Sequence, residues 1–387
     1  MAVSRRQWFA DLAPMRASRR PGVWLAARGR EHDTAVGPAA GADDAAALRL
    51  NSNENPVGPA ASVLAAITAA LPAAGRYPDK AKVSETTLVG AIAAANGVAN
   101  ENIVWGAGSA ELLDAATRAY TSPSKPFVTA WPSFETAHTR ASKVGAPIRE
   151  VPLDAAQALD VDRLIAASAG AGLVYFCNPN NPTGTVHGHA TVTEFVARVH
   201  AASPDAVVLI DEAYHDYVTD PAYATAVPLA VATPNVIVTR TFSKAHGMAG
   251  VRLGYAIGQR ATVRAISRYR NGLGMSVPGV AAGVASLADT AHLDAERARN
   301  TAVRAFTVRA FGDLGLTAAA SQANFVYVKI GAPTAPFRDA CQKAGVLVGR
   351  DFPPAGNPYC RISIGTMAEM QQAVAVFRKI LAAPRGR

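Results

Sequence analysis

The sequence predicts an α/β fold, in which a mostly parallel central sheet is packed between helices. Short, nearly continuous apolar runs at 172–177, 206–211 and 235–241 have the length and composition of strands that are buried on both faces. Most of these runs are separated by stretches with helical periodicity, which supply the crossovers that parallel strands require. Together the two observations favour a large domain built around one sheet.

The other elements of this domain follow from the same patterns. The run 102–106 leads into a stretch whose apolar positions recur at helical spacing, and 126–130 is a short strand. After the three buried runs, 253–258 is the last strand expected in the sheet. We place the large domain at about residues 76–285.

A smaller α+β domain is expected from residues 48–75 together with 286–387. Its strands, 324–330 and 359–364, alternate apolar with polar residues. A terminal helix is expected from about Ala368. We expect this domain to close over a substrate that is bound in the large one.

Length, composition and charge limit the function classes. The chain has 387 residues and is 50% hydrophobic, which is enough for two packed domains. No apolar run approaches the roughly 18 to 20 residues that a membrane span needs, so we expect no membrane association. Most of the formal charge of +9 lies in the arginine-rich residues 1–30 and not on a folded basic face. We therefore expect no nucleic-acid partner.

Residues 1–47 are expected to form a basic N-terminal arm and linker. The stretch SRRQWF, residues 4–9, is similar to the start of a twin-arginine export signal. Such a signal continues into an apolar segment of about 7 to 15 residues, which Asp11, Pro14 and Arg16 interrupt here. We interpret the arm as a degenerate signal and expect a cytoplasmic protein. The alternative is a periplasmic or exported protein that uses a twin-arginine-type signal.

Neither the cysteines nor the histidines predict a metal site. Cys177, Cys341 and Cys360 are odd in number and lack Cys-x-x-Cys spacing, while His187 and His189 have no acidic or thiol partner nearby in the sequence. We expect buried thiols, a solvated histidine loop and no bound metal.

Polar and glycine-containing segments follow four of the expected strands. In an open α/β sheet, ligands bind beyond the carboxyl ends of the strands, so these segments are expected to meet in one crevice. They are GAGSAE at 106–111, NPNNPTG at 178–184, DEAY at 211–214 and TFSK at 241–244.

Lys244 is the candidate nucleophile of this crevice. An ammonium group that is partly desolvated and close to a second cation, such as Arg252, has a lowered pKa and can attack a carbonyl. Asp211 ends an apolar strand, where a carboxylate needs a cationic partner, and a protonated ring nitrogen is such a partner. The amide of Asn181 and the phenol of Tyr214 supply further polar groups.

The same segments also contain groups that suit a phosphate. The backbone N–H groups of Gly108, Ser109 and Ala110 lie at an expected helix N-terminus, which favours an anion. Hydroxyl and guanidinium groups that suit the same anion come from Thr241, Ser243 and Arg252. A lysine for an aldehyde, a partner for a pyridinium and a phosphate cup together predict pyridoxal 5'-phosphate as the cofactor.

With these motifs the chain resembles the fold-type I, class I/II aminotransferases that depend on pyridoxal phosphate, and within them the histidinol-phosphate aminotransferase group. The resemblance covers about residues 48–383 and implies the fold-type I pairing of a large cofactor-binding domain with a smaller α+β domain. The motifs that carry it, in the family's order, are LNSNENPVGP, RYPD, GAGSAELL, WPSFETA, NPNNPTG, DEAY, TFSKAHGMAGVRLGY, QANFVYV and CRISIGT.

The resemblance implies a role for each candidate residue. Lys244 carries the cofactor's aldehyde and moves the proton at the substrate's Cα, Asp211 pairs with the pyridinium nitrogen, and Phe134 stacks on the ring. Asn181 and Tyr214 bind the ring oxygen. The residues implied to hold the phosphate are Gly108, Ser109, Ala110, Thr241, Ser243 and Arg252.

The resemblance also implies a partner chain and a substrate class. Tyr77 is expected to reach the cofactor phosphate of a second subunit, which makes the active unit a homodimer. Arg361 is expected to bind the anionic group of the substrate, and Arg350 is a further candidate. Two guanidiniums suit a dianionic phosphate, which favours L-histidinol phosphate as the amino donor. The acceptor is expected to be a 2-oxo acid, 2-oxoglutarate, in a ping-pong reaction.

Departures from the family's pattern leave the donor open. Ala110 stands where the histidinol-phosphate group usually has aspartate, and His246 where an aromatic or aliphatic residue is commoner. An aromatic or other α-amino acid is therefore an alternative donor. A decarboxylase or lyase on the same scaffold is a second alternative, because the cofactor residues are shared. A regulator that only binds would need a DNA-binding domain, which residues 1–47 cannot supply.

Overall fold

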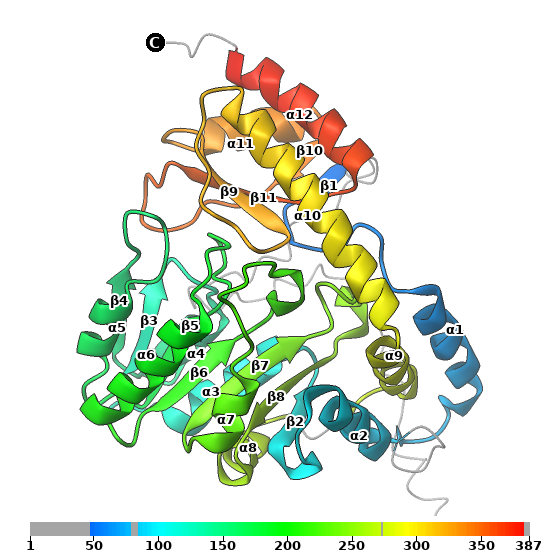
Figure 1. Cartoon of the computed structure of the whole chain (residues 1–387), viewed down its shortest axis with the longest axis vertical. Coiled ribbons are helices and arrows are strands. Elements are labelled where there is room, and N and C mark those ends of the chain that lie inside the picture. Colours follow the sequence, from blue (N-terminus) through cyan, green and yellow to red (C-terminus); the bar gives the residue numbers. More distant parts are fainter. Residues whose placement is uncertain (1–46, 79–83, 272–273, 383–387) are drawn as a thin grey trace, which may run out of the picture. The chain divides into compact units, whose positions relative to one another are not determined.

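A seven-stranded sheet lies at the centre of the computed structural model, which describes residues 47–78, 84–271 and 274–382 (Figure 1). The strand order is β2–β8–β7–β6–β5–β3–β4. The strands are β2 Ile103–Gly106, β3 Phe127–Trp131, β4 Ile148–Pro152, β5 Leu173–Cys177, β6 Val207–Asp211, β7 Val236–Thr241 and β8 Gly254–Gly258. All neighbours run parallel except at β8, which is antiparallel to both β2 and β7. The predicted α/β fold with a mostly parallel sheet is confirmed.

The six strands predicted for this sheet are all present, each within one residue of its predicted bounds. The seventh, β4, was not predicted. It is an edge strand that pairs only with β3, and Arg149, Glu150 and Pro152 are exposed along it. A half-solvated edge strand has no continuous apolar run, so the pattern of a doubly buried strand does not find it.

Side chains of the sheet alternate between two apolar layers. In β6, Val207 and Leu209 belong to one buried cluster, while Val208 and Ile210 belong to another. This period of two is what a strand buried on both faces requires. The helices that contribute to the first cluster are α3 Ser109–Tyr120, α4 Thr136–Lys143 and α8 Arg260–Ser267. Those that contribute to the second include α2 Glu85–Asn96, α5 Val161–Ala167, α6 His189–Ala202 and α7 Val227–Ala232.

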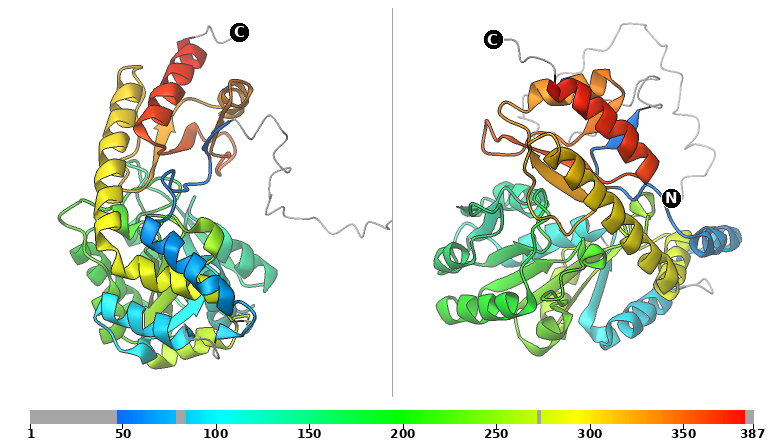
Figure 2. Two further views of the ribbon diagram at one scale, coloured as in Figure 1. Left: turned by 90° about the vertical axis from the view of Figure 1, so that its right-hand side faces the viewer. Right: turned by 45° about the horizontal axis from the view of Figure 1, so that its top comes forward.

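Two small sheets and three helices make a further apolar cluster. Strand β11 pairs antiparallel with β9, and β1 pairs parallel with β10. The strands are β1 Leu48–Leu50, β9 Phe325–Lys329, β10 Val346–Val348 and β11 Tyr359–Ser363. The helices are α10 Thr290–Gly312, α11 Ala335–Lys343 and α12 Met367–Ala382, and α12 packs against both of the others (Figure 2). The two predicted strands and the predicted terminal helix are thus present.

Local signals in the sequence explain where individual helices begin and end. Ser84 is the N-cap of α2 and accepts a hydrogen bond from the Thr87 backbone N–H. Gly97 ends the same helix in the left-handed conformation, with φ +63°. Helix α1, Ala61–Ala70, packs against α9, Val277–Ala288.

The domain boundaries proposed from the sequence stay predictions. Residues 1–46 of the predicted N-terminal arm, together with the twin-arginine-like stretch, lie outside the described residues. In the part that is described, the three cysteines are buried and unpaired.

Candidate active site

Lys244 lies on the turn that follows β7, and its side chain reaches toward the segment after β1. Its Nζ donates hydrogen bonds to the backbone oxygens of Asn53 (3.1 Å) and Ser52 (3.3 Å) and lies 5.8 Å from the centre of the Tyr214 ring. Burial lowers the pKa of Lys244 to about 8, and the charge of Arg361 adds to this effect. At neutral pH an amine with this pKa has a usable unprotonated fraction, as a nucleophile needs.

Asp211 is the last residue of β6 and is buried, with 1% exposure. Its two carboxylate oxygens accept hydrogen bonds from the hydroxyls of Tyr175 (2.8 Å) and Thr239 (2.9 Å). Burial raises the pKa of Asp211 to about 6, and the two hydrogen bonds oppose that rise. Within the described residues no cationic side chain lies within 4.0 Å of it. A buried carboxylate of this kind is ready to pair with a cation.

Tyr214 is buried three residues after Asp211, and Asn53 holds its hydroxyl. The Asn53 Nδ2 group donates to the Tyr214 hydroxyl at 3.1 Å, and the backbone N–H of Asn53 donates to Ser363 Oγ at 2.8 Å. Asn53 has φ +53°, a left-handed conformation that asparagine tolerates better than most residues. The ring of Tyr214 meets Phe325 edge to face at 5.1 Å. The side chain of Tyr214 is therefore fixed in position on several sides.

A cup of backbone and hydroxyl groups lies at the N-terminus of α3. Gly108 is the N-cap of this helix with φ +81°, and a Cβ at this position would overlap the guanidinium of Arg252. Ser243 Oγ accepts from Thr241 Oγ1 at 3.0 Å and from Arg252 Nη1 at 3.4 Å. The structure thus brings together the three groups that the sequence assigned to an anion: the helix N-terminus, the hydroxyls and the guanidinium.

Arg361 lies in β11 with 9% exposure, and its contacts are to neutral oxygens. Nη1 donates to Asn181 Oδ1 at 2.7 Å and Nη2 to the Asn51 backbone oxygen at 2.6 Å. Nε is buried and has no hydrogen-bond partner in the described part of the chain. Burial lowers the pKa of Arg361, and the nearby charge of Arg350 lowers it further. A buried guanidinium without an acid is a ready receptor for an anion.

Arg350 is close to Arg361 but is already paired. Its Nη2 lies 2.5 Å from Glu135 Oε1, and both side chains are partly exposed. The guanidinium carbons of Arg350 and Arg361 lie 4.4 Å and 5.1 Å from the centre of the Phe352 ring, so both cations are close to one aromatic side chain. The second guanidinium predicted for the substrate is therefore present, with an acid bound to it.

The remaining predicted residues differ in their surroundings. Ala110 is the second residue of α3 and is half-buried, and Phe134 is half-buried against the apolar layer that contains α3. Tyr77 stands apart: its side chain is 77% exposed, and among the described residues it makes none of the hydrogen bonds or ring contacts that join the others. Its predicted role concerns a second chain.

Several residues of the site were missed by the sequence reasoning. Tyr175 and Thr239 lie inside apolar strands, and nothing in the sequence distinguishes them there from residues that only pack in the core. Asn53 belongs to the motif LNSNENPVGP, which was quoted but given no role, so its signal was present. Glu135 likewise belongs to the motif WPSFETA but was given no role. Phe352 gave no signal, because its part in the site comes from its ring contacts with Arg350 and Arg361.

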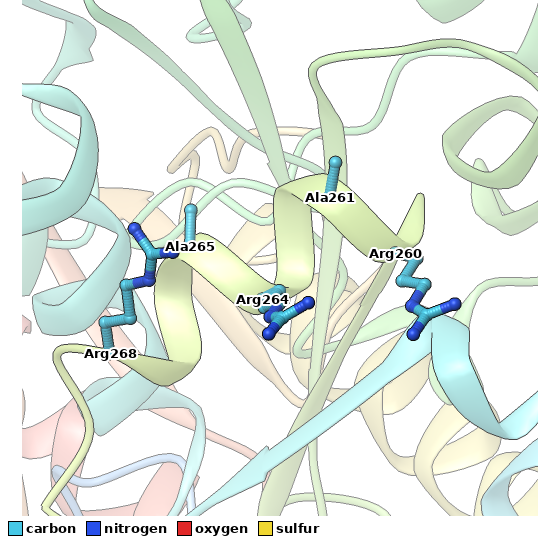
Figure 3. Close-up of a pocket in the computed structure, with 5 residues that line it drawn as sticks. All are labelled: Arg260, Ala261, Arg264, Ala265 and Arg268. Atoms are coloured by element: carbon cyan, nitrogen blue, oxygen red, sulfur yellow. The ribbon is translucent and has the colours of Figure 1, made fainter.

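Other features of the described residues are separate from this set. The surface hollow in Figure 3 is lined by Arg260, Ala261, Arg264, Ala265 and Arg268, all on or next to α8 and none of them a predicted site residue. Among the residues with a described placement, no three His, Cys, Asp or Glu side chains are grouped as a metal site would need. No helix in the ranges that the structure covers is long and apolar enough to cross a membrane.

Comparison with known proteins identifies the family. The model of the class I and II aminotransferases matches residues 46–377. The chain belongs to this family. The aminotransferase is 38% identical to an aromatic amino acid aminotransferase of Rhodococcus jostii, over 84% of this chain and 87% of the relative. It is 35% identical to histidinol-phosphate aminotransferase 1 of Cupriavidus pinatubonensis, over 88% of this chain and 90% of the relative.

Solved structures agree with this membership. Histidinol-phosphate aminotransferase of Sinorhizobium meliloti, in complex with pyridoxal 5'-phosphate, superposes with a TM-score of 0.81 and 31% identity, covering 88% of this chain and 92% of that one. The predicted resemblance, the fold-type I architecture and the aminotransferase activity are thereby confirmed, and the cofactor is pyridoxal phosphate. The substrates of this aminotransferase are small molecules. The family membership favours amino-group transfer over the decarboxylase or lyase alternative.

The residues of this aminotransferase fit that cofactor. The buried carboxylate of Asp211 suits a pyridinium cation, and the lowered pKa of Lys244 suits an aldehyde partner. Gly108 keeps the N-terminus of α3 free of a side chain that would overlap Arg252. Each of the three chemical groups of pyridoxal phosphate therefore has a counterpart among these residues.

Proposed function

We propose that the aminotransferase transfers the amino group of L-histidinol phosphate to a 2-oxo acid, with 2-oxoglutarate as the acceptor, in a ping-pong reaction. The observation that carries this proposal is that two guanidiniums, those of Arg361 and Arg350, lie close to the same ring, that of Phe352. A phosphate monoester carries up to two negative charges, which two guanidiniums match better than one. The histidinol-phosphate aminotransferases among the relatives support the same substrate class.

A second donor class is favoured by one observation. Because Glu135 already pairs with Arg350, Arg361 is the one guanidinium of the two that lacks an acidic partner within the described residues. A single free guanidinium matches the α-carboxylate of an aromatic amino acid. The aromatic amino acid aminotransferase of Rhodococcus jostii supports this alternative.

The roles proposed for the residues follow from their chemistry. When bound, pyridoxal phosphate supplies an aldehyde for the amino group and a ring that withdraws electrons from the substrate's Cα. Lys244 Nζ holds the cofactor and moves the proton at Cα, since its lowered pKa lets it both accept and release that proton. Asp211 keeps the ring nitrogen protonated. Asn181 and Tyr214 hold the ring oxygen.

The remaining proposed roles concern orientation and binding. Phe134 contacts the face of the ring. Arg361 orients the anionic end of the donor, and its buried position excludes water from that contact. The phosphate group of the cofactor is held by Gly108, Ser109, Ala110, Thr241, Ser243 and Arg252.

The test of the donor is a comparison of kcat/KM values. Histidinol phosphate is measured beside histidinol, phenylalanine and tyrosine, with 2-oxoglutarate as acceptor. Loss of the phosphate from the donor is expected to lower kcat/KM by a factor of about 100 or more, because Arg361 is left buried without its anion. A tenfold or greater preference for phenylalanine or tyrosine would reject histidinol phosphate as the donor and support the second class.

The active unit is proposed to be a homodimer. Exposed large apolar side chains gather in residues 57–77: Val57 (55% exposed), Leu64 (52%), Leu71 (54%) and Tyr77 (77%). Four exposed large apolar side chains within 21 residues of sequence favour a contact with another chain over exposure to solvent. Light scattering on the purified protein tests the stoichiometry, and a monomer at assay concentration would reject the proposal.

The proposed compartment is the cytoplasm. This proposal is supported by the sequence after Arg5 and Arg6, because Asp11 and Pro14 interrupt the apolar segment that an export signal needs. Cell fractionation with the native N-terminus tests it. A periplasmic product that lacks the arm would reject the proposal in favour of export.

A further inference from the structure

The Glu135 carboxylate forms an ion pair with Arg350, the second guanidinium of the proposed anion site. Glu135 is the N-cap residue of α4, yet its side chain makes no capping hydrogen bond and instead pairs with Arg350 at 2.5 Å. Arg350 lies on the loop between β10 and β11, so the ion pair joins the large sheet's helix α4 to the segment that carries Arg361. Glu135 directly follows Phe134, the residue proposed to contact the cofactor ring.

In the described part of the chain, Glu135 is the acidic side chain that forms an ion pair with Arg350. Asp351, next in the chain, pairs with Arg338 at 3.2 Å, and only its backbone oxygen accepts from Arg350. The charge of Glu135 also acts on Arg361, whose pKa it raises while Arg350 lowers it. The three charges of Arg350, Arg361 and Glu135 are therefore coupled and sum to +1.

From this arrangement we infer that Glu135 determines which anion the aminotransferase prefers. A monoanionic carboxylate at Arg361 balances the sum of +1 and leaves the Glu135–Arg350 pair in place. A dianionic phosphate needs a sum of +2, so it has to take Arg350 from Glu135 and is repelled by the carboxylate that it displaces. The pair is 40% to 49% exposed, and exposed pairs of this kind are weak enough to exchange partners.

The inference rests on the proposed role of Arg361 as the anion site, and the test measures a ratio. In Glu135→Gln the kcat/KM for histidinol phosphate, divided by that for phenylalanine, is expected to rise about three- to tenfold, the range for one partly screened charge. Glu101→Gln is the matched control, because Glu101 forms a similar exposed pair with Arg260 at 3.5 Å. Its ratio is expected to stay at the wild-type value.

A second variant separates competition for Arg350 from a general charge effect. In an Arg350→Ala background, Glu135→Gln is expected to change the ratio by less than about twofold, since no second guanidinium is left to release. An unchanged ratio in Glu135→Gln, or the same gain without Arg350, would overturn the inference.

Equilibrium binding gives a readout that does not depend on turnover. Calorimetry on the cofactor-loaded protein compares phenyl phosphate with 3-phenylpropionate, neither of which has an amino group to transfer. Glu135→Gln is expected to tighten phenyl phosphate binding about three- to tenfold and to leave 3-phenylpropionate within about twofold. Equal changes for both ligands would overturn the inference. Failure of the wild type to use histidinol phosphate would reject the proposed donor without touching this result.

Discussion

Two ionisable side chains in the crevice have pKa values displaced toward neutrality from opposite directions. Burial lowers the pKa of Lys244 to about 8 and raises that of Asp211 to about 6. In both cases the uncharged form is favoured because the surroundings are poorly solvated. A ligand with an aldehyde can react with the uncharged amine of Lys244, and a cationic group on the same ligand can pair with the carboxylate of Asp211. The two shifted pKa values therefore suit these residues to the cofactor.

Replacement of Lys244 by alanine is expected to abolish turnover while leaving the protein folded. Among the residues that the structure describes, the side chain makes hydrogen bonds only to the backbone oxygens of Ser52 and Asn53. Loss of the covalent cofactor link is expected to remove the absorption band of the lysine-bound cofactor and to lower kcat by a factor of about 1,000 or more. Absorption spectra and steady-state rates check this. An active variant with an unchanged spectrum would exclude Lys244 as the cofactor lysine.

Replacement of Asp211 by asparagine is expected to stabilise the cofactor-free protein at neutral pH. The folded-state pKa of Asp211 is raised from 3.8 to about 6, so the folded protein carries an ionised, buried carboxylate above pH 6. As the pH falls from 6 to 4, the folded carboxyl takes up its proton before the unfolded one does, and the wild type regains stability. The unfolding free energy of Asp211→Asn should therefore exceed that of the wild type by about 1 to 3 kcal/mol above pH 6, and the two values should converge below pH 4.

Chemical denaturation of both cofactor-free proteins between pH 4 and 8 measures this difference. Asp162→Asn is the control, because that side chain is 80% exposed, and its unfolding free energy is expected to follow the wild type. An Asp211→Asn variant less stable than the wild type at pH 8 would contradict the prediction. The same variant should bind pyridoxal phosphate more weakly, since the partner of the ring nitrogen is lost.

At the scale of elements, the N-terminus of α3 depends on glycine for its shape. Gly108 caps the helix with φ +81° and ψ 160°, a combination that residues with a side chain rarely adopt, and Gly254 on β8 lies so close that a Cβ there would overlap the Ser109 backbone nitrogen. These two glycines let the helix end approach the strand and leave Arg252 beside it. The free N–H groups of the first turn can then face an anion together with the guanidinium.

Gly108→Ala is expected to weaken cofactor binding at least tenfold. The added methyl group overlaps the Arg252 guanidinium and forces it out of the cup. Gly345→Ala is the matched control: its φ is +77°, close to the +81° of Gly108, but its Cβ would meet nothing within 4 Å. Both variants should lose roughly 1 to 3 kcal/mol of stability through backbone strain at positive φ, whereas only Gly108→Ala should raise the Kd for pyridoxal phosphate in a fluorescence titration. Equal Kd values for the two variants would contradict this account.

The same scale shows how far the sequence predicts this molecule. Doubly buried strands were found because their apolar runs are nearly continuous, and the segments at their ends were found because the carboxyl ends of parallel strands meet at one edge of the sheet. Strand β4 was missed because an exposed edge removes that pattern. The hydrogen bond from Asn53 to Ser363, and the pairing of Glu135 with Arg350, join segments that are distant in the chain, and no local pattern records such contacts.

At the scale of the whole molecule, the proposal of a second subunit rests on the exposed apolar side chains of residues 57–77. Tyr77 is the most exposed of these large hydrophobic side chains, although tyrosine usually buries its ring. A contact with another chain would cover this ring and leave its hydroxyl for a polar partner. The predicted partner is the cofactor phosphate of the other subunit, which would make each site depend on two chains.

Mixing one weakened and one inactive variant tests this dependence. Tyr77→Phe removes one hydrogen bond to a charged phosphate and is expected to lower activity about tenfold, and Lys244→Ala is expected to be inactive. In a mixed dimer, one site combines the Lys244 of the first chain with the Tyr77 of the second and is native, while the other site lacks both. Equal amounts that exchange freely should therefore recover about a quarter of the wild-type activity.

Tyr269→Phe is the control variant. It changes another exposed tyrosine and should be fully active alone. Verified exchange of chains without any recovery would show that Tyr77 acts within its own subunit or not at all.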